Sequence, residues 1–405
     1  MQSVLRLGAF VPALISLFLL APFFVPVSGQ EPAQQRPRRV TTPDGERPAK
    51  APTTNPSIEE VDEGEVVRVE TQLVSVPAVV TNGSGRPLAG LRTENFVLFE
   101  NGQQQKIANF ATTEAPFEIA LLLDTSGSTR ADIALIRQAA NAFVEALRPG
   151  DRVAIVGFNT LRQGRSAIAT PEVLSKLTDD RKQLRDAVER LGSSNGTPLY
   201  DGLERITDEV FLEAPREETR GRRALVALTD GVDSASNSDF QTTRLKLLRS
   251  GIASYFIQVN TEEFVEERLL RDCQDDGAVV LSRKQLERYR RVFFPRAQRE
   301  DYVDFCAMGS FQRMQISRDL YNLARREMME LAKASGGNNF LAATLQDARA
   351  AFARVATEIG TQYSLGYYPE NKARDGKFRT IRVEVQGVPD KPRVRAREGY
   401  YAPKT

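Results

Sequence analysis

Four short apolar runs, separated by amphipathic segments, constrain the fold of this 405-residue chain more than any other feature. The apolar runs are residues 119–123, 153–158, 224–228 and 252–259. Runs without polar alternation are typical of strands that are covered on both faces. Helical periodicity fits residues 131–147, 181–191, 199–212, 240–249, 318–334 and 345–359. Repeated strand–helix units predict an α/β domain with a doubly wound, mostly parallel sheet.

Both flanks of this region alternate between apolar and polar residues, as half-buried strands do. In the first flank, Asn101-Gly102 is a strong signal for a tight hairpin turn. Each flank has only two to four strands, which is a weak basis for an independent domain. We therefore expect residues 65–115 and 363–405 to form one small β-sandwich, with the α/β domain, residues 116–362, inserted between them.

The N-terminal 29 residues have the pattern of an export signal peptide. Arg6 is the only charged residue, an apolar stretch follows, and small residues precede a cleavage position near Gly29-Gln30. An uncleaved membrane anchor is the alternative, although three prolines interrupt the stretch. Residues 30–64 are rich in Pro, Gln and charge, which predicts a disordered linker. We expect a secreted, periplasmic or cell-envelope protein.

Three features of the composition exclude several classes of site. The chain has no histidine, which excludes His-based catalytic triads and histidine zinc sites. A net charge of +2 gives no general attraction to nucleic acid. The two cysteines, Cys273 and Cys306, are too few for a disulfide framework. Export permits a bond between them, and two free thiols are the alternative.

Residues 261–317 interrupt the strand–helix alternation. This segment is dense in charge and contains both cysteines, so we expect a partly helical insertion. Its basic run at 283–291 has two interpretations: a solvated helix face, which is the more common case, or a surface for an acidic partner.

Oxygen-bearing side chains follow two of the predicted strands. Ligands of open α/β sheets bind at the carboxyl ends of the strands, where the strand order reverses. The first predicted strand is followed by Asp124, Thr125, Ser126 and Ser128, and another is followed by Thr229, Asp230 and Asp233. Thr197, before a predicted helix, adds a further hydroxyl. A site with oxygen ligands only favours a hard divalent cation such as Mg²⁺.

Asp124-x-Ser126-x-Ser128, Thr197 and Asp230 together resemble the metal-ion-dependent adhesion site of von Willebrand factor type A (VWA) domains. The resemblance implies a Rossmann-like domain and a binding function without catalysis. It implies that Ser126, Ser128 and Thr197 contact the metal directly, and that Asp124 and Asp230 act mostly through water.

Around these ligands, Thr125 and Asp233 are candidates for groups that hold them in place. Mn²⁺ and Ca²⁺ remain alternatives to Mg²⁺. The implied partner is a protein that offers a carboxylate to the metal.

The flanks resemble those of secreted bacterial proteins with a VWA-related domain, through GRPLAGLRTENFVLFENGQQQKI before the α/β domain and YSLGYYPE and REGYY after it. The insertion at 261–317 departs from this pattern. We expect it to change the geometry of partner binding and to leave the metal residues untouched.

Other functions fit the sequence less well. The stretch LLLDTSGST is similar to an aspartic-protease motif, but an extra serine separates Thr125 from Gly127, and the strand–helix alternation is wrong for that all-β fold. A serine nucleophile would lack both a GxSxG turn and a histidine. A phosphotransferase would need an aspartate at position 126. Two non-enzymatic alternatives remain: a degenerate site, and an envelope scaffold with a structural metal that binds through the insertion.

Overall fold

The computed structural model describes the α/β domain and both flanking segments. The described residues are 73–127, 133–164, 166–219, 221–273, 275, 280–296, 304–389 and 391–404. The expected signal peptide and linker lie outside the described residues, as does Ser128. Within the described ranges, no helix has the length and apolar character that a membrane span requires.

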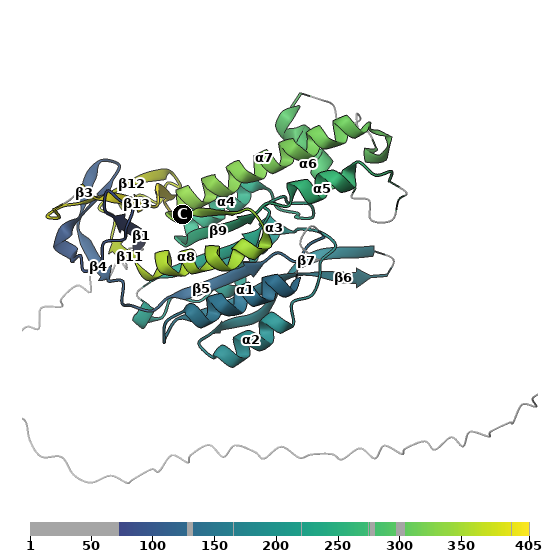
Figure 1. The fold of residues 1–405 in the computed structure, drawn as a ribbon. Coiled ribbons are helices and arrows are strands. Elements are labelled where there is room, and N and C mark those ends of the chain that lie inside the picture. The colour runs from purple at the N-terminus through teal and green to yellow at the C-terminus, as the bar shows by residue number, and fades with distance from the viewer. Residues whose placement is uncertain are drawn as a thin grey trace, which may run out of the picture. The chain divides into compact units, whose positions relative to one another are not determined.

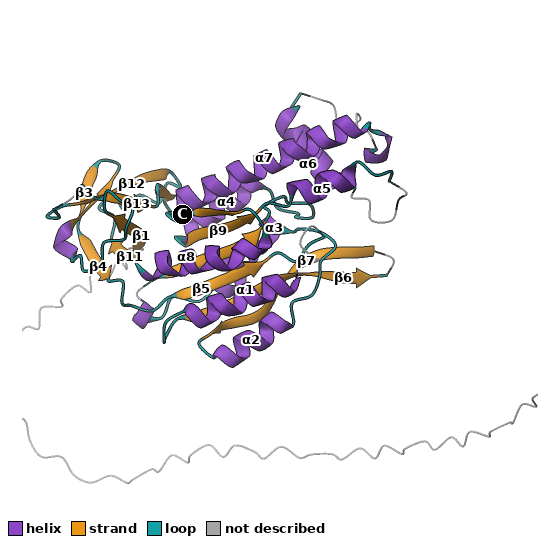
Figure 2. Ribbon diagram, in the orientation of Figure 1, coloured by secondary structure: helices purple, strands orange, loops and turns teal. Residues whose placement is uncertain are grey.

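A six-stranded sheet with the order β10-β9-β8-β5-β6-β7 forms the centre of the α/β domain (Figures 1 and 2). Its strands are β5 (Glu118–Leu123), β6 (Arg152–Gln163), β7 (Ser166–Thr178), β8 (Arg223–Thr229), β9 (Ala253–Val259) and β10 (Asn339–Ala342). All neighbours are parallel except β6 and β7, which form a long antiparallel hairpin. The mostly parallel sheet is therefore confirmed, whereas β7 and β10 were not predicted because neither is a continuous apolar run.

Helices cover both faces of this sheet, as expected for a doubly wound fold. The helices are α1 (Ile133–Ala146), α2 (Arg181–Glu189), α3 (Leu199–Arg205), α4 (Phe240–Ser250), α7 (Ser310–Ser335) and α8 (Ala348–Gly360). On β5, Leu121 packs with α1, α2 and α8, while Leu122 packs on the other face with α3, α4 and α7. Because every residue of β5 is buried between these layers, its apolar run carries no polar alternation.

Two helix boundaries have clear causes in the local sequence. Thr344 forms a capping box with Asp347 before α8, and Gly336 ends α7 with a φ of 83°. Gly336 also lies against the β-sandwich, because a Cβ there would be 2.7 Å from the backbone nitrogen of Arg397.

The two flanking segments combine into one β-sandwich, as predicted. One sheet has the order β13-β1-β11-β4 and the other β14-β12-β2-β3. The strands are β1 (Val74–Thr81), β2 (Phe96–Glu100), β3 (Gln103–Gln105), β4 (Ile107–Ala111), β11 (Tyr363–Tyr367), β12 (Phe378–Val385), β13 (Arg393–Ala396) and β14 (Gly399–Tyr401). Both sheets contribute to one apolar core that includes Val76, Leu98 and Leu365. The predicted hairpin turn is confirmed, with Asn101 and Gly102 both at positive φ between β2 and β3.

A buried carboxylate ties the two sheets of the sandwich together. Glu100 Oε2 accepts hydrogen bonds from the hydroxyls of Tyr367 (2.6 Å) and Tyr400 (2.9 Å), and Glu100 Oε1 pairs with Arg379 at 3.3 Å. Both charged side chains are almost fully buried. A buried charge of this kind requires its partners, because an unpaired ion in the interior is very costly.

The insertion is partly helical, as predicted. It contains α5 (Glu262–Leu269), α6 (Arg283–Phe293) and the first turns of α7, which begins at Ser310, within the segment assigned to the insertion. A disulfide joins Cys273 and Cys306 on either side of α6. In Figure 1 the insertion and the β6–β7 hairpin lie at one end of the central sheet, and the β-sandwich lies at the other.

Candidate metal centre

The candidate site lies where the two central strands β5 and β8 end. The order of the sheet reverses here, since the chain continues from β5 to β6 on one side and has β8 on the other. Leu123 is in register with Leu228, and the backbone N–H of Asp124 donates to the carbonyl of Leu228 at 2.9 Å. Asp124 and Asp230 therefore leave the sheet side by side, at the position where such folds bind ligands.

The carboxylate of Asp124 is held in a fixed orientation. Its Oδ1 accepts from the backbone N–H of Ser126 at 3.0 Å, and its Oδ2 accepts from the Thr229 hydroxyl at 2.7 Å. The residue is 1% exposed. Burial, followed by the negative charge of Asp230, raises the pKa of Asp124 to about 7, although hydrogen bonds from Thr229 and Ser126 oppose the shift.

The carboxylate of Asp230 is oriented by the loop that follows β8 and by the insertion. Its Oδ1 accepts from the backbone N–H of Val232 at 3.0 Å, and its Oδ2 accepts from the Thr261 hydroxyl at 2.8 Å. Gly231 makes the turn with a φ of +82°, a conformation that is strained for other residues. The insertion, whose first residue is Thr261, therefore contacts the site directly.

Thr197 is brought to this site through the backbone. Its N–H donates to the Ser234 hydroxyl at 2.8 Å, and its carbonyl accepts from the N–H groups of Ser234 (3.0 Å) and Ala235 (3.3 Å). The Thr197 residue is 5% exposed. Within the described part of the chain, the Thr197 hydroxyl makes no hydrogen bond, so its oxygen atom is free to bind a ligand.

Thr125 and Asp233 support the surrounding loops. The Thr125 hydroxyl donates to the carbonyl of Phe158 at 3.2 Å, and its own carbonyl accepts from Ser194 at 3.0 Å. Asp233 Oδ2 accepts from the backbone N–H of Leu199 at 2.9 Å, at the start of α3. Burial raises the pKa of Asp233. Asp233 therefore fixes the beginning of the helix that follows Thr197.

These groups fit a hard divalent cation. Two buried carboxylates lie close enough for the charge of one to raise the pKa of the other, and a cation between them would relieve that repulsion. Ser126, after β5, and Thr197, in the loop before α3, add neutral oxygen atoms to the site. Among the described residues, no group of three or more His, Cys, Asp or Glu side chains is placed to hold a metal. The candidate site is not a group of that kind, because it has only two carboxylates and its other oxygen atoms belong to hydroxyl groups.

Thr229 was among the predicted oxygen-bearing side chains, whereas Thr261 and Tyr321 were not predicted as members of the site. Thr229 contacts Asp124 and Thr261 contacts Asp230, while Tyr321 lies 2.7 Å from the Thr261 hydroxyl. Thr261 could have been predicted by the same argument about strand ends. It follows the end of β9, which is the neighbour of β8 in the sheet. Tyr321 comes from α7, and no local sequence pattern connects it to this site.

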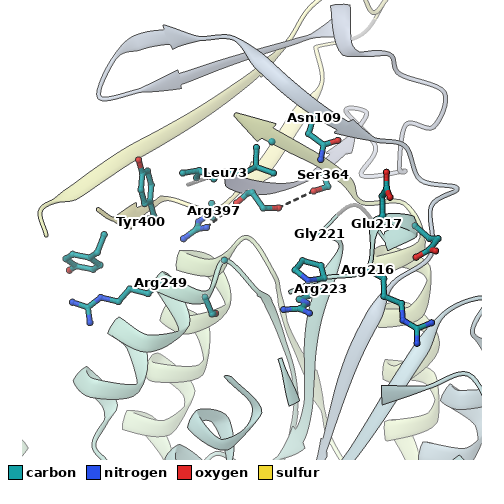
Figure 3. A pocket seen from close by; sticks show the side chains of 18 residues that line it. Leu73, Asn109, Arg216, Glu217, Gly221, Arg223, Arg249, Ser364, Arg397 and Tyr400 are labelled. Carbon is teal, nitrogen blue, oxygen red and sulfur yellow. Dashed lines mark hydrogen bonds between the residues drawn. The ribbon is translucent and has the colours of Figure 1, made fainter. Parts of the chain in front are cut away.

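A pocket of about 850 Å³ lies at the opposite end of the sheet, between the β-sandwich and the start of β8 (Figure 3). Its central guanidinium groups already have protein partners. Arg223 pairs with Glu118 at 2.8 Å, and Arg397 donates to the carbonyls of Ser75 and Gly399. We therefore assign this pocket to the boundary between the two parts of the fold and place the candidate function at the strand ends.

Residues 118–285 match the family model described as the von Willebrand factor type A domain. This part of the chain is a VWA domain. The match begins at β5 and includes the ends of β5 and β8 and the loop that carries Thr197. VWA domains are generally non-catalytic modules for protein–protein interaction and adhesion.

Several solved structures are similar to the chain. One is proximal thread matrix protein 1 from the mussel byssus, with 14% identity, a TM-score of 0.37, and coverage of 62% of this chain and 47% of that one. This chain thus spans about half the length of the mussel protein.

Two further solved structures come from bacteria. A von Willebrand factor type A protein from Catenulispora acidiphila has 11% identity, a TM-score of 0.39, and coverage of 82% of this chain and 74% of that one. An aerotolerance-related membrane protein from Bacteroides fragilis has 14% identity, a TM-score of 0.35, and coverage of 60% and 98% respectively. No curated protein matches the chain.

Proposed function

We propose that this chain is an exported, non-enzymatic binding protein that captures a carboxylate of a partner protein at a divalent metal site. The observation that carries the proposal is the pair of buried carboxylates, Asp124 and Asp230, at the switch point of a VWA domain. The Thr197 hydroxyl, which makes no hydrogen bond among the described residues, supplies a third oxygen atom.

Each residue has a separate role in this proposal. Ser126, Ser128 and Thr197 would hold the metal through neutral hydroxyls, and Asp124 and Asp230 would balance its charge. Mg²⁺ is the expected ion because the ligands are all oxygen atoms, with Mn²⁺ or Ca²⁺ as alternatives. When bound, the ion would supply an electrophilic position that a partner's carboxylate completes.

Metal binding by the full chain tests this function. Calorimetric titration with Mg²⁺ should show one saturable site in the wild-type protein. The variant Thr197→Val keeps the shape of the side chain and removes its hydroxyl, so affinity should fall about tenfold. Thr357→Val is the matched control, because Thr357 lies on α8 and its hydroxyl bonds only within that helix. Equal affinity in all three proteins would contradict the assignment of Thr197.

Export is the second part of the proposal, and it rests on the signal-peptide pattern of the N-terminal 29 residues. Sequencing the N-terminus of the protein recovered from outside the cytoplasm tests it. A mature chain that begins near Gln30 supports cleavage, and a chain that keeps Arg6 in the membrane fraction supports an anchor.

A scaffold that binds through the insertion is the alternative function. Two observations favour it: Phe311 is 82% exposed and Phe294 is 54% exposed, and both lie on the insertion. Large apolar side chains on a surface often mark a site of protein contact. Deleting the whole insertion would not discriminate, because it would also remove the hydrogen bond from Thr261 to Asp230. Partner capture with and without a chelator, compared with capture by Phe311→Ser, separates the two functions.

A further inference from the structure

The insertion shares a hydrophobic cluster with the loop that follows Asp230. Val232 lies in this loop and packs in one buried cluster with Leu269 of α5, Leu286 of α6 and Leu320 of α7. Residues 230–239 form neither helix nor strand, so their position depends on what packs against them. The insertion is therefore part of the support of the metal site, rather than a separate appendage.

Helix α6 also contacts this loop through hydrogen bonds. At its N-cap, the Ser282 hydroxyl donates to the carbonyl of Ser234 at 2.8 Å. The Lys284 ammonium donates to the carbonyls of Ala235 (2.7 Å) and Ser236 (3.0 Å), and to the Asn237 side chain at 3.0 Å. A single ammonium group thus gathers three oxygen atoms of residues 235–237, and its positive charge strengthens each bond.

The same loop holds Thr197. Ser234 accepts from the Thr197 N–H, and the Thr197 carbonyl accepts from Ser234 and Ala235. One residue earlier, Asp233 accepts from Leu199 and from Tyr200 at the start of α3. Among the described residues, every hydrogen bond of the Thr197 backbone is therefore made with Ser234 or Ala235. Both residues lie in the segment that α6 contacts.

A second set of hydrogen bonds connects α6 to helices α3 and α7. Arg288 of α6 hydrogen-bonds both the Tyr200 hydroxyl and Glu327 of α7, and Tyr200 donates to Glu327 at 2.7 Å. The Arg288 and Glu327 side chains are 12% and 9% exposed. The prediction that the basic run is a solvated helix face is therefore confirmed for Arg291, which is exposed, and is wrong for Arg288. Because breaking a buried ion pair is strongly destabilising, Arg288 is a poor choice for a test.

We propose that Lys284 is a positioning residue for the metal site, which places the Thr197 hydroxyl by holding residues 235–237. This role rests on the proposed function, because it concerns the same site. Lys284 itself does not contact the metal. In its absence the segment loses three hydrogen bonds to a charged donor, and Thr197 loses its fixed position.

The test compares three variants of the full chain. Lys284→Met keeps the length of the side chain and removes the ammonium. Lys284→Arg restores a cation that can donate to the same carbonyls. Arg291→Met removes the same charge from an exposed position on the same helix, which controls for electrostatic attraction of the metal. Far-ultraviolet circular dichroism verifies that all variants are folded.

Two readouts decide the proposal. Calorimetry should show about fivefold weaker Mg²⁺ binding in Lys284→Met, partial recovery in Lys284→Arg, and wild-type affinity in Arg291→Met. Amide hydrogen exchange, measured in chelator, should be faster at residues 234–237 and at Thr197 in Lys284→Met alone.

The failures of the two proposals are distinguishable. Wild-type Mg²⁺ binding with unchanged affinity in Lys284→Met would overturn the role of Lys284 and leave the proposed function standing. A wild-type protein that binds no Mg²⁺ would overturn the proposed function and this role together. Equal losses in Lys284→Met and Arg291→Met would overturn positioning, because charge alone would then explain the effect.

Discussion

The hydroxyl of Thr261 donates a hydrogen bond of 2.8 Å to Asp230, across the boundary between the metal site and the insertion. The same hydroxyl lies 2.7 Å from that of Tyr321. Both threonine and tyrosine are buried, and burial, followed by the negative charge of Asp230, keeps the pKa of Tyr321 well above its ordinary value. This chain of contacts connects the end of β8 to helix α7.

Thr261→Val should weaken Mg²⁺ binding about tenfold, because Asp230 loses the donor that orients one of its oxygen atoms. Valine has nearly the same volume, so the fold should remain. Tyr321→Phe is the matched control, since it removes the other contact of Thr261 and leaves the bond to Asp230. Calorimetry on both variants checks the prediction, and a larger loss in Tyr321→Phe would contradict it.

Gly231→Ala should weaken Mg²⁺ binding because it changes the turn between Asp230 and Val232. An alanine there would adopt a φ of +82° and place its Cβ 3.2 Å from Gln258 Nε2. Gly85→Ala controls for the backbone strain, since its φ is +79° but no atom lies within 4 Å. Each substitution should cost roughly 1–2 kcal/mol in the free energy of unfolding. Only Gly231→Ala should alter metal affinity, and identical binding curves would contradict the assigned site.

The metal should stabilise the folded chain by mass action. At a Mg²⁺ concentration one hundred times its Kd, the free energy of unfolding should rise by about 2.7 kcal/mol, if the unfolded chain does not bind the ion. Urea denaturation with Mg²⁺ and with chelator measures this difference. In Asp124→Asn the two curves should coincide, and a persisting shift would place the ion elsewhere.

Glu100→Gln should destabilise the β-sandwich and leave metal binding unchanged. The change removes the carboxylate that pairs with Arg379 in the interior, which should cost about 3–5 kcal/mol in the free energy of unfolding. The exposed pair Arg283–Glu287 provides the control, since Glu287→Gln should cost less than about 1 kcal/mol. Thermal denaturation and calorimetry are the measurements, and a metal affinity that falls with Glu100→Gln would show that the sandwich influences the site.

The sequence was sufficient to predict the central strands and to name most of the candidate ligands, because both depend on local patterns. The run before Asp124 has no polar residue, and a strand buried on both faces requires this. Strand β7 was missed because its mixed polar pattern reflects the edge of the sheet, where one side faces solvent. The order of the strands, rather than any motif, then brings Asp124 and Asp230 together.

The role of the insertion could not be predicted from local patterns. Lys284 lies in a basic run, and such runs are usually solvated helix faces. Its contacts with the carbonyls of Ala235 and Ser236 involve residues nearly fifty positions away in the sequence. Tyr321 is similar, because it lies 60 positions from Thr261 in the sequence. Long-range packing of this kind leaves no periodic signal in either segment.

The most direct test of the central claim is a calorimetric titration of the full chain with Mg²⁺, wild type beside Asp124→Asn. The account predicts one saturable site in the wild-type protein and none in the variant, with both proteins folded by circular dichroism. Equal binding by the two proteins, or no binding by the wild type, would contradict the claim that the ends of β5 and β8 form a metal site.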